Sequence, residues 1–194
     1  LIDAIGGYYD AETGSFDANN NIWNHCLAIW GLVSAKASVP QQAIDWLKAQ
    51  RNADGGWGWA AGQSSDSNST AMAVQTLVAA GVDPGDSYWD DCVTLYHSWQ
   101  NDDGGFLNDP RYGTTSDADS TGMSIQALTA LGIDTSSGWD WARTVTATEQ
   151  ITMVINKPLD RLYEYQIAGG AFEWQSGFGA NLFATLDAIP AIAG

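Results

Sequence analysis

The chain has 194 residues, of which 45% are hydrophobic, and its formal net charge is −16 at pH 7. Its seven Lys and Arg residues are scattered along the sequence, whereas nucleic acids and anionic membranes are bound by clustered cations. The apolar stretches are shorter than the roughly 20 residues of a membrane-spanning helix. We therefore expect a single domain over residues 1–194, with no nucleic-acid partner and no membrane span.

Two segments of the chain, residues 46–83 and 96–134, are copies of each other. Each contains, in order, a Gln, an Asp-Gly-Gly-aromatic loop, an Asp followed by Ser and Thr, and an apolar run that closes on Gly-x-Asp. Internal similarity of this kind is the signature of a repeat fold. Weaker flanking copies complete four predicted repeats, approximately at residues 1–37, 38–84, 85–135 and 136–194.

The flanking copies are less regular. In the first of them, at residues 24–31, His25-Cys26 takes the place of the Thr-Ala pair. In the last, at residues 169–189, we align Asp187 with Gln126 of the preceding repeat.

Within each repeat the pattern predicts two helices. Residues 43–50 and 86–100 carry apolar side chains at three-residue spacing, which is typical of helices with one apolar face. The runs that begin at Ala71 and Gly122 are more apolar and should be buried on most sides. Carboxylates and hydroxyls just before these runs can cap the helix N-termini. The sequence therefore predicts an outer and an inner layer of helices.

The Asp-Gly-Gly loops should turn sharply, because glycine tolerates positive φ at little cost. The aromatic residue that follows each loop, Trp57 or Phe106, is expected to fold back as a structural peg. Most aromatic residues fall on outer helices or loops, which favours core packing over a cavity that binds a cation. Period-two alternation is short and rare, so the predicted class is all-α, a stack of helical hairpins.

The order of Gln, Gly-Gly, aromatic residue and Thr-Ala-opened apolar helix resembles the repeat of prenyltransferases and of squalene and oxidosqualene cyclases. Gln100, Asp103, Gly104 and Phe106 match the glutamine-tryptophan motif of that family, whereas the segment from Gln50 to Trp57 carries one extra residue. The resemblance implies an α/α toroid. Toroids of this family close their ring with more hairpins than the four predicted here, so the ring should be open or incomplete. We expect the chain to be part of a longer secreted protein, or to need a second domain or subunit to cover the open ring.

The resemblance also implies a place for an acid. Class II terpenoid cyclases protonate an alkene or epoxide with the middle Asp of a DxDD motif at the start of an inner helix. In the first clear repeat Asn68 takes the donor position. In the second, Asp119 aligns with the donor, Asp117 could hold it, and Ser120 replaces the last acid. Asp117 and Asp119 are therefore the candidate catalytic residues, and helix capping is the alternative role.

Metal binding has less support. Zinc-dependent members of the family use Asp, Cys and His, but Cys92 falls on an outer-type helix, and no third ligand accompanies His25-Cys26. We expect no zinc site. Calcium is a separate hypothesis for the acidic loop at residues 102–119, because carboxylate oxygens suit that ion. Cys26 and Cys92 lie on different predicted helices and are expected to be buried free thiols.

Low Lys content with abundant Gly, Ser, Asn, Thr and Trp is typical of an extracellular or cell-surface bacterial protein. The leading hypothesis is a non-catalytic module of the prenyltransferase and squalene-cyclase repeat type, which binds an apolar small molecule or a protein partner on its concave face. Vitamin B12 carriers of this fold bind without reacting. The alternative is a class II terpenoid cyclase domain or fragment, similar to squalene-hopene cyclase, in which Asp119 is the general acid. A third hypothesis is a purely architectural extracellular stalk.

Overall fold

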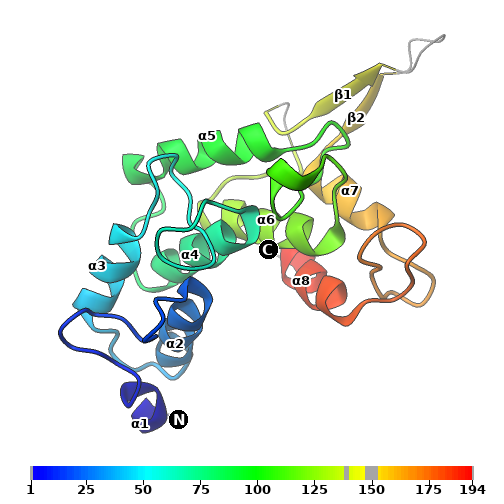
Figure 1. The fold of residues 1–194 in the computed structure, drawn as a ribbon. Coiled ribbons are helices and arrows are strands. Elements are labelled where there is room, and N and C mark those ends of the chain that lie inside the picture. The colour runs from blue at the N-terminus through cyan, green and yellow to red at the C-terminus, as the bar shows by residue number, and fades with distance from the viewer. Residues whose placement is uncertain (1, 138–139, 147–152, 194) are drawn as a thin grey trace. The chain divides into compact units, whose positions relative to one another are not determined.

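The structure is a computed structural model that describes residues 2–137, 140–146 and 153–193 (Figure 1). The described residues form eight α-helices, two short 3₁₀ helices and one β-hairpin, which confirms the predicted all-α class apart from the hairpin. By their internal contacts they form two compact units, Leu1–Cys92 and Val93–Gly194. No helix in the described part of the chain is long and apolar enough to cross a membrane.

The first unit contains two inner helices and one outer helix between them. Its elements are α1 (Ile2–Gly6), α2 (Ile22–Ser34), α3 (Gln41–Ala49), α4 (Ser67–Ala79) and the 3₁₀ helix Ser87–Trp89. The inner helices α2 and α4 pack against each other, and α3 contacts both of them. This is the predicted arrangement of an amphipathic outer helix beside more apolar inner helices.

The second unit repeats this plan. Its elements are α5 (Asp90–Trp99), which starts at the end of the first unit, the 3₁₀ helix Pro110–Tyr112, α6 (Ala118–Ala130), β1 (Arg143–Thr146), β2 (Met153–Asn156), α7 (Pro158–Glu164) and α8 (Leu182–Ala193). The inner helix α6 packs on α8, and the outer helix α7 contacts both. The antiparallel strands pair Arg143 with Asn156 and Thr146 with Met153. Little β structure was expected from the sequence, and this hairpin, which falls in the predicted fourth repeat, was not predicted.

One hydrogen-bond pattern recurs in all four predicted repeats. An Asn or Asp caps each inner helix, and the side chain four residues later accepts a hydrogen bond from the backbone N–H of the aromatic residue after the loop. The caps are Asn21, Asp66, Asp117 and Asn181. The acceptors are His25, Thr70, Thr121 and Thr185, and their donors are Phe16, Trp57, Phe106 and Phe172, at 2.9–3.1 Å.

This shared register corrects two sequence alignments. The side chain that donates to the carbonyl of the first loop glycine is Gln100 in the third repeat, but in the second repeat it is Arg51 and not Gln50. Arg51 Nε lies 3.0 Å from the Gly55 carbonyl, whereas Gln50 Nε2 turns back to the Trp46 carbonyl. This accounts for the apparent extra residue of the second repeat.

The second correction concerns the last inner helix. Counted from the cap Asn181, Asp187 takes the sixth position of α8. Counted from the cap Asp117, that position in α6 is held by Met123 and not by Gln126. An acid therefore replaces a residue that is apolar in the preceding repeat.

The loops behave as predicted from their glycines. Gly55 and Gly104 have φ of +95° and +88°, and a Cβ on either would lie 2.7 Å from a backbone carbon of Asp91 or Asn156. The chain needs glycine at these positions both for the positive φ and for the close approach. The aromatic pegs Trp57 and Phe106 that follow are fully buried, as predicted.

Candidate functional site

The inner helices each present one face that points away from the adjacent loop. In α6 the fourth position after the cap, Thr121, binds the loop, and the fifth, Gly122, lies against α8. Because each residue turns an α-helix by about 100°, positions two, six and nine after the cap lie on the side away from that loop. We call this side the inner face. It contains Asp119, Met123, Gln126, Phe183, Asp187 and Pro190 in the second unit.

Asp117, one of the two predicted catalytic residues, is the N-cap of α6. It is 2% exposed, and its carboxylate accepts hydrogen bonds from Ser120 N at 2.7 Å and from Ser120 Oγ at 2.9 Å. Burial raises the pKa of Asp117 to about 6, although the bonds from Ser120 oppose the shift. Both oxygens are thus engaged in holding the start of the helix.

Asp119, the second predicted catalytic residue, lies on the inner face and meets an acid that the sequence analysis did not single out. Its carboxyl group is hydrogen-bonded to that of Asp187 on α8. Burial, followed by this hydrogen bond and the neighbouring charge, raises the pKa of Asp187 well above its usual range. Both carboxyl groups are half-buried, and we call them the acid pair. Sequence reasoning could have found Asp187 only from its replacement of Met123 in the repeat register.

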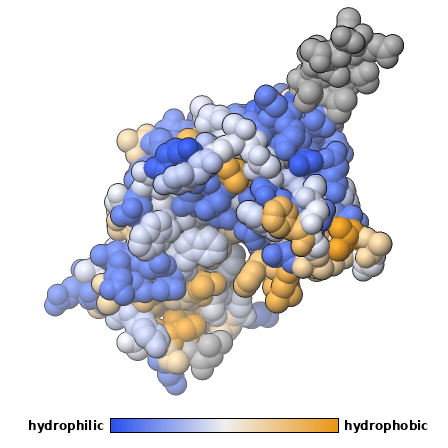
Figure 2. Space-filling model, turned by 45° about the vertical axis from the view of Figure 1, so that its right-hand side comes forward, coloured by the Kyte–Doolittle hydropathy of each residue, from blue (hydrophilic) through white to orange (hydrophobic). Residues whose placement is uncertain are grey.

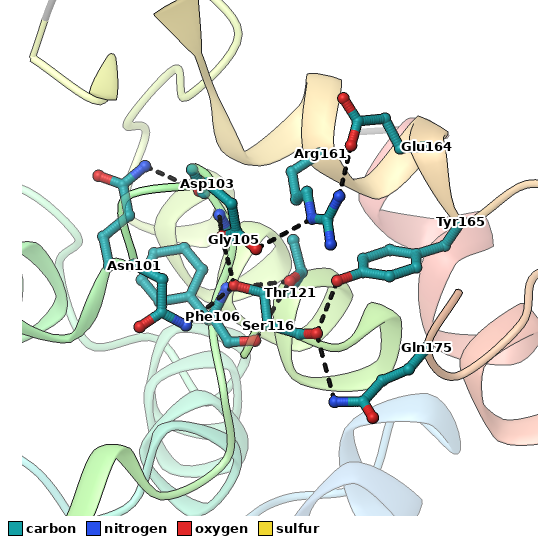
Figure 3. Close-up of polar contacts among 12 residues, drawn as sticks. Asn101, Asp103, Gly105, Phe106, Ser116, Thr121, Arg161, Glu164, Tyr165 and Gln175 are labelled. Carbon is teal, nitrogen blue, oxygen red and sulfur yellow. Dashed lines mark hydrogen bonds and ion pairs between the residues drawn. The ribbon is translucent and has the colours of Figure 1, made fainter. Parts of the chain in front are cut away.

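The loop that precedes α6 is organised around Ser116 (Figure 3). Its Oγ donates to Asp103 at 2.6 Å and accepts from Asn101 at 2.9 Å, while its carbonyl accepts from Tyr165 Oη at 2.6 Å. Asp103 also lies 3.2 Å from Arg161 Nε. The second repeat contains the same arrangement of Asn52, Ser65 and Asp54.

These contacts bear on the calcium hypothesis for residues 102–119. Asp103 is bonded to Ser116, Asp117 to Ser120, and Asp109 to Arg111, whose guanidinium lowers the pKa of Asp109. Across the described residues there is no group of three or more His, Cys, Asp or Glu side chains that could hold a metal ion. Calcium binding stays a prediction from the sequence, with no ligand set of this kind to support it.

The residues considered for zinc are parts of the core. His25 Nδ1 accepts a hydrogen bond from Phe16 N, which leaves Nε2 to donate to the Ala43 carbonyl at 3.0 Å. Burial lowers the pKa of His25 to about 4. Cys26 and Cys92 are buried free thiols, as predicted, and burial raises the pKa of each to about 12. Thiols in this state are poor metal ligands because the thiolate is the form that binds.

The inner face of the first unit is aromatic, which the sequence analysis missed by placing most aromatic residues on outer helices and loops. On α2, Trp23, Leu27 and Trp30 recur at the spacing of successive helical turns. Leu27 is 53% exposed, and both indole rings are partly exposed. Trp23 is fixed by a hydrogen bond of 2.9 Å from its Nε1 to Ser69 Oγ on α4. This ridge of three side chains is available for contact with an apolar group.

The second unit contains a cleft of about 440 Å³. It lies where α6 and α8 end, and its lining includes Ile125, Thr129, Ile133, Leu159, Ala191 and Ile192. A volume of this size accommodates a small molecule. The acid pair does not contribute to its lining.

Comparison with known proteins identifies the family of this chain and a solved structure with a similar fold. The model of the prenyltransferase alpha-alpha toroid domain matches residues 21–158. Among solved structures, the chain is similar to Candida albicans protein geranylgeranyltransferase-I complexed with GGPP, with a TM-score of 0.62 and 13% sequence identity. The match covers 96% of this chain and 52% of that chain, so this chain spans about half of its length. Among curated proteins none matches this sequence. An identity this low shows a shared fold and not a shared activity.

Proposed function

This chain belongs to the prenyltransferase alpha-alpha toroid domain family, and we propose that it is a non-catalytic module that binds an apolar small molecule on its inner face. The observation that carries the proposal is the ridge of Trp23, Leu27 and Trp30 on α2. Aromatic rings give a ligand a large contact area at a small cost in side-chain entropy. A protein partner with an apolar side chain could use the same ridge.

The binding role is also supported by the position of Asp117, one of the two candidate catalytic acids. Asp117 occupies a cap position that is Asn21 in the first repeat and Asn181 in the fourth. Because Asn and Asp both serve there, the position requires a hydrogen-bond acceptor and not an acid. The partial DxDD motif is thereby reduced to Asp119.

The alternative, a class II terpenoid cyclase with Asp119 as general acid, is disfavoured by the acid pair. Protonation of an alkene requires a strong acid, since the conjugate carbocation is very unstable. Burial raises the pKa of Asp187, so Asp187 is a weak acid, and the carboxyl group of Asp119 is held in a hydrogen bond to it.

We also propose that the protein works outside the cell or at the bacterial cell surface. The support is compositional: 23 acidic residues against seven basic ones, with 21 glycines.

The binding proposal is tested by titrating the chain with farnesol, an uncharged isoprenoid alcohol, and following tryptophan fluorescence. We expect saturable quenching that Leu27→Asp weakens at least tenfold, because it places a charge in the middle of the ridge. Leu186→Asp on α8, which is equally exposed at 53%, is the matched control and should bind normally. No saturable binding, or equal binding by the Leu27 variant, would overturn the proposal.

The cyclase alternative is tested in the same preparations. Squalene is incubated with the chain and with Asp119→Asn, and products are separated by gas chromatography. We expect no cyclic product from either protein. Cyclic product from the unaltered chain that disappears in the variant, while thermal stability is retained, would establish the alternative instead.

A further inference from the structure

The inner face of the first unit is built by two helices that contain no charged side chain. Neither α2 nor α4 has an Asp, Glu, Lys or Arg, although the chain carries 23 acidic and seven basic residues. The second unit differs, because Asp119 and Asp187 lie on its inner face. A charged group that leaves water needs a partner of opposite charge. The inner face of the first unit therefore favours an uncharged ligand.

The apolar side chains of this face are open to contact. Hydrophobic residues form separate groups among hydrophilic ones on the face of the molecule drawn in Figure 2. Among the described residues of the first unit, Leu27 is the exposed large hydrophobic residue that lies on an inner helix. It stands between Trp23 and Trp30, which are seven residues apart and therefore separated by about 10 Å along the helix axis. An apolar chain can lie along this ridge.

The helices α2 and α4 run side by side in the same direction. Trp23 Nε1 donates to Ser69 Oγ at 2.9 Å and thereby joins their first turns, and the two helices pack against each other. The residues at position nine after the two caps therefore lie at the same level. They are Trp30 on α2 and Gln75 on α4. An indole N–H and a side-chain amide thus stand together at one end of the ridge.

These two polar groups are available to a ligand. Among the described residues, neither Trp30 Nε1 nor the Gln75 amide has a hydrogen-bond partner, and both side chains are partly exposed. The equivalent residue of the second unit, Gln126, differs because its amide donates to the Asp187 carbonyl at 2.8 Å. An indole N–H donates, whereas an amide both donates and accepts. The hydroxyl group of an alcohol matches this set, because it also donates and accepts.

The opposite end of the ridge offers no comparable set of groups. There Trp23 Nε1 is engaged by Ser69, and Asn68 is 7% exposed and accepts a hydrogen bond from Ser67 Oγ at 3.1 Å. The distribution of free polar groups therefore gives a ligand one orientation, with its polar head at the level of position nine and its apolar chain toward Trp23.

We propose that the first unit binds an uncharged amphiphile with one hydrogen-bonding head group, an alcohol, whose hydroxyl is held by Trp30 Nε1 and the Gln75 amide. The apolar chain of this ligand lies along Leu27 and Trp23. The inference rests on the proposed function, and it adds the chemical class of the ligand and two residues that determine specificity. A hydrogen bond of this kind contributes roughly fivefold to the affinity.

The test compares farnesol with farnesene, a hydrocarbon with the same carbon skeleton, by titration of tryptophan fluorescence. Gln75→Met keeps the side-chain volume and removes the amide, so it should weaken farnesol binding roughly fivefold and leave farnesene binding unchanged. Because each Kd is compared with that of the same ligand on the unaltered chain, the different solubilities of the two ligands cancel. Gln63→Met, at an exposed residue in the loop before α4, is the matched control and should change neither Kd.

A second variant and a charged ligand complete the experiment. Trp30→Phe, which keeps an aromatic ring and removes the N–H, should also weaken farnesol more than farnesene, and Trp23 remains as a fluorescent reporter. Farnesyl diphosphate should bind about tenfold more weakly than farnesol, because the inner helices offer it no cation and the chain carries −16.

The outcomes separate this inference from the proposed function. If farnesol and farnesene bind but Gln75→Met weakens both equally or neither, the head-group site is refuted while binding on the ridge stands. Farnesyl diphosphate that binds as tightly as farnesol would overturn the assignment to uncharged ligands in the same way. If neither farnesol nor farnesene binds the unaltered chain, the proposed function is refuted, and this inference with it.

Discussion

Replacing Asp117 with Asn should change how the free energy of unfolding depends on pH, because Asn can cap the helix as Asp does but cannot ionise. Asp117 is buried, and its pKa in the folded chain is raised from 3.8 to about 6. The folded state therefore holds the proton more tightly than the unfolded chain does. It follows that this group's contribution to the free energy of unfolding falls as pH rises from about 4 to about 6, and stays low above that range.

The size of the effect follows from the same shift. A pKa raised from 3.8 to about 6 corresponds to about 3 kcal/mol of stability that the ionised carboxylate loses relative to the protonated form. Asn keeps the acceptor that binds Ser120 N, and the Ser120 hydroxyl can rotate to accept from the new amide. The change in capping itself should thus be nearly the same at every pH.

The assay is urea unfolding of the unaltered chain and of Asp117→Asn at pH 4 and pH 7, followed by circular dichroism. We expect the stability of the variant relative to the unaltered chain to be higher at pH 7 than at pH 4 by about 2 to 3 kcal/mol. Asp117→Ala, which removes the cap, should lose about 1 kcal/mol more than Asn at either pH. Equal pH dependence in the unaltered chain and the Asn variant would refute the reasoning from burial.

Two further predictions concern packing and the thiols. Gly122→Ala should lower the free energy of unfolding by about 1 kcal/mol despite the better helix propensity of Ala, because the new Cβ would lie 2.8 Å from the Asp187 carbonyl oxygen. Gly6→Ala is the control and should not destabilise the chain, because nothing lies within 4 Å of a Cβ at that position. Urea unfolding of the two variants compares these effects. Cys26 and Cys92 are buried and their pKa is raised to about 12, so Ellman's reagent at pH 8 should detect neither thiol until denaturant is added. Rapid reaction of the folded chain would contradict this burial.

The parts of the fold that the sequence predicts are those that depend on local hydrogen bonds. A cap such as Asp66 and the acceptor four residues later, Thr70, act through the adjacent loop, so each repeat carries its own visible signature. The positive φ of the loop glycines is equally local, because it is a property of the turn itself. For these features residue type and spacing are sufficient.

The features that the sequence did not predict depend on contacts between distant segments. The pairing of Asp119 with Asp187 exists only because α6 packs on α8, and a sequence alignment that was three residues out of register hid the position of Asp187. Likewise, whether Gln50 or Arg51 binds the loop is decided by where α3 ends, since the two donors are adjacent. Trp23 and Trp30 were overlooked because α2 belongs to the least regular repeat.

The register also explains why a partial catalytic motif can arise without catalysis. An inner helix of this repeat needs an acceptor at its cap, and Asp is one of the side chains that meet that need. With Asp117 at the cap position, a second acid two residues later, Asp119, makes the segment resemble a proton-donating motif whatever the role of Asp119 is. The chemistry of Asp119 is then set by Asp187, a residue that the motif does not include. The substitution that tests the role of the acid pair most directly is Asp187→Met, which restores the side chain found at that position in α4 and α6 and removes the hydrogen bond between the two acids.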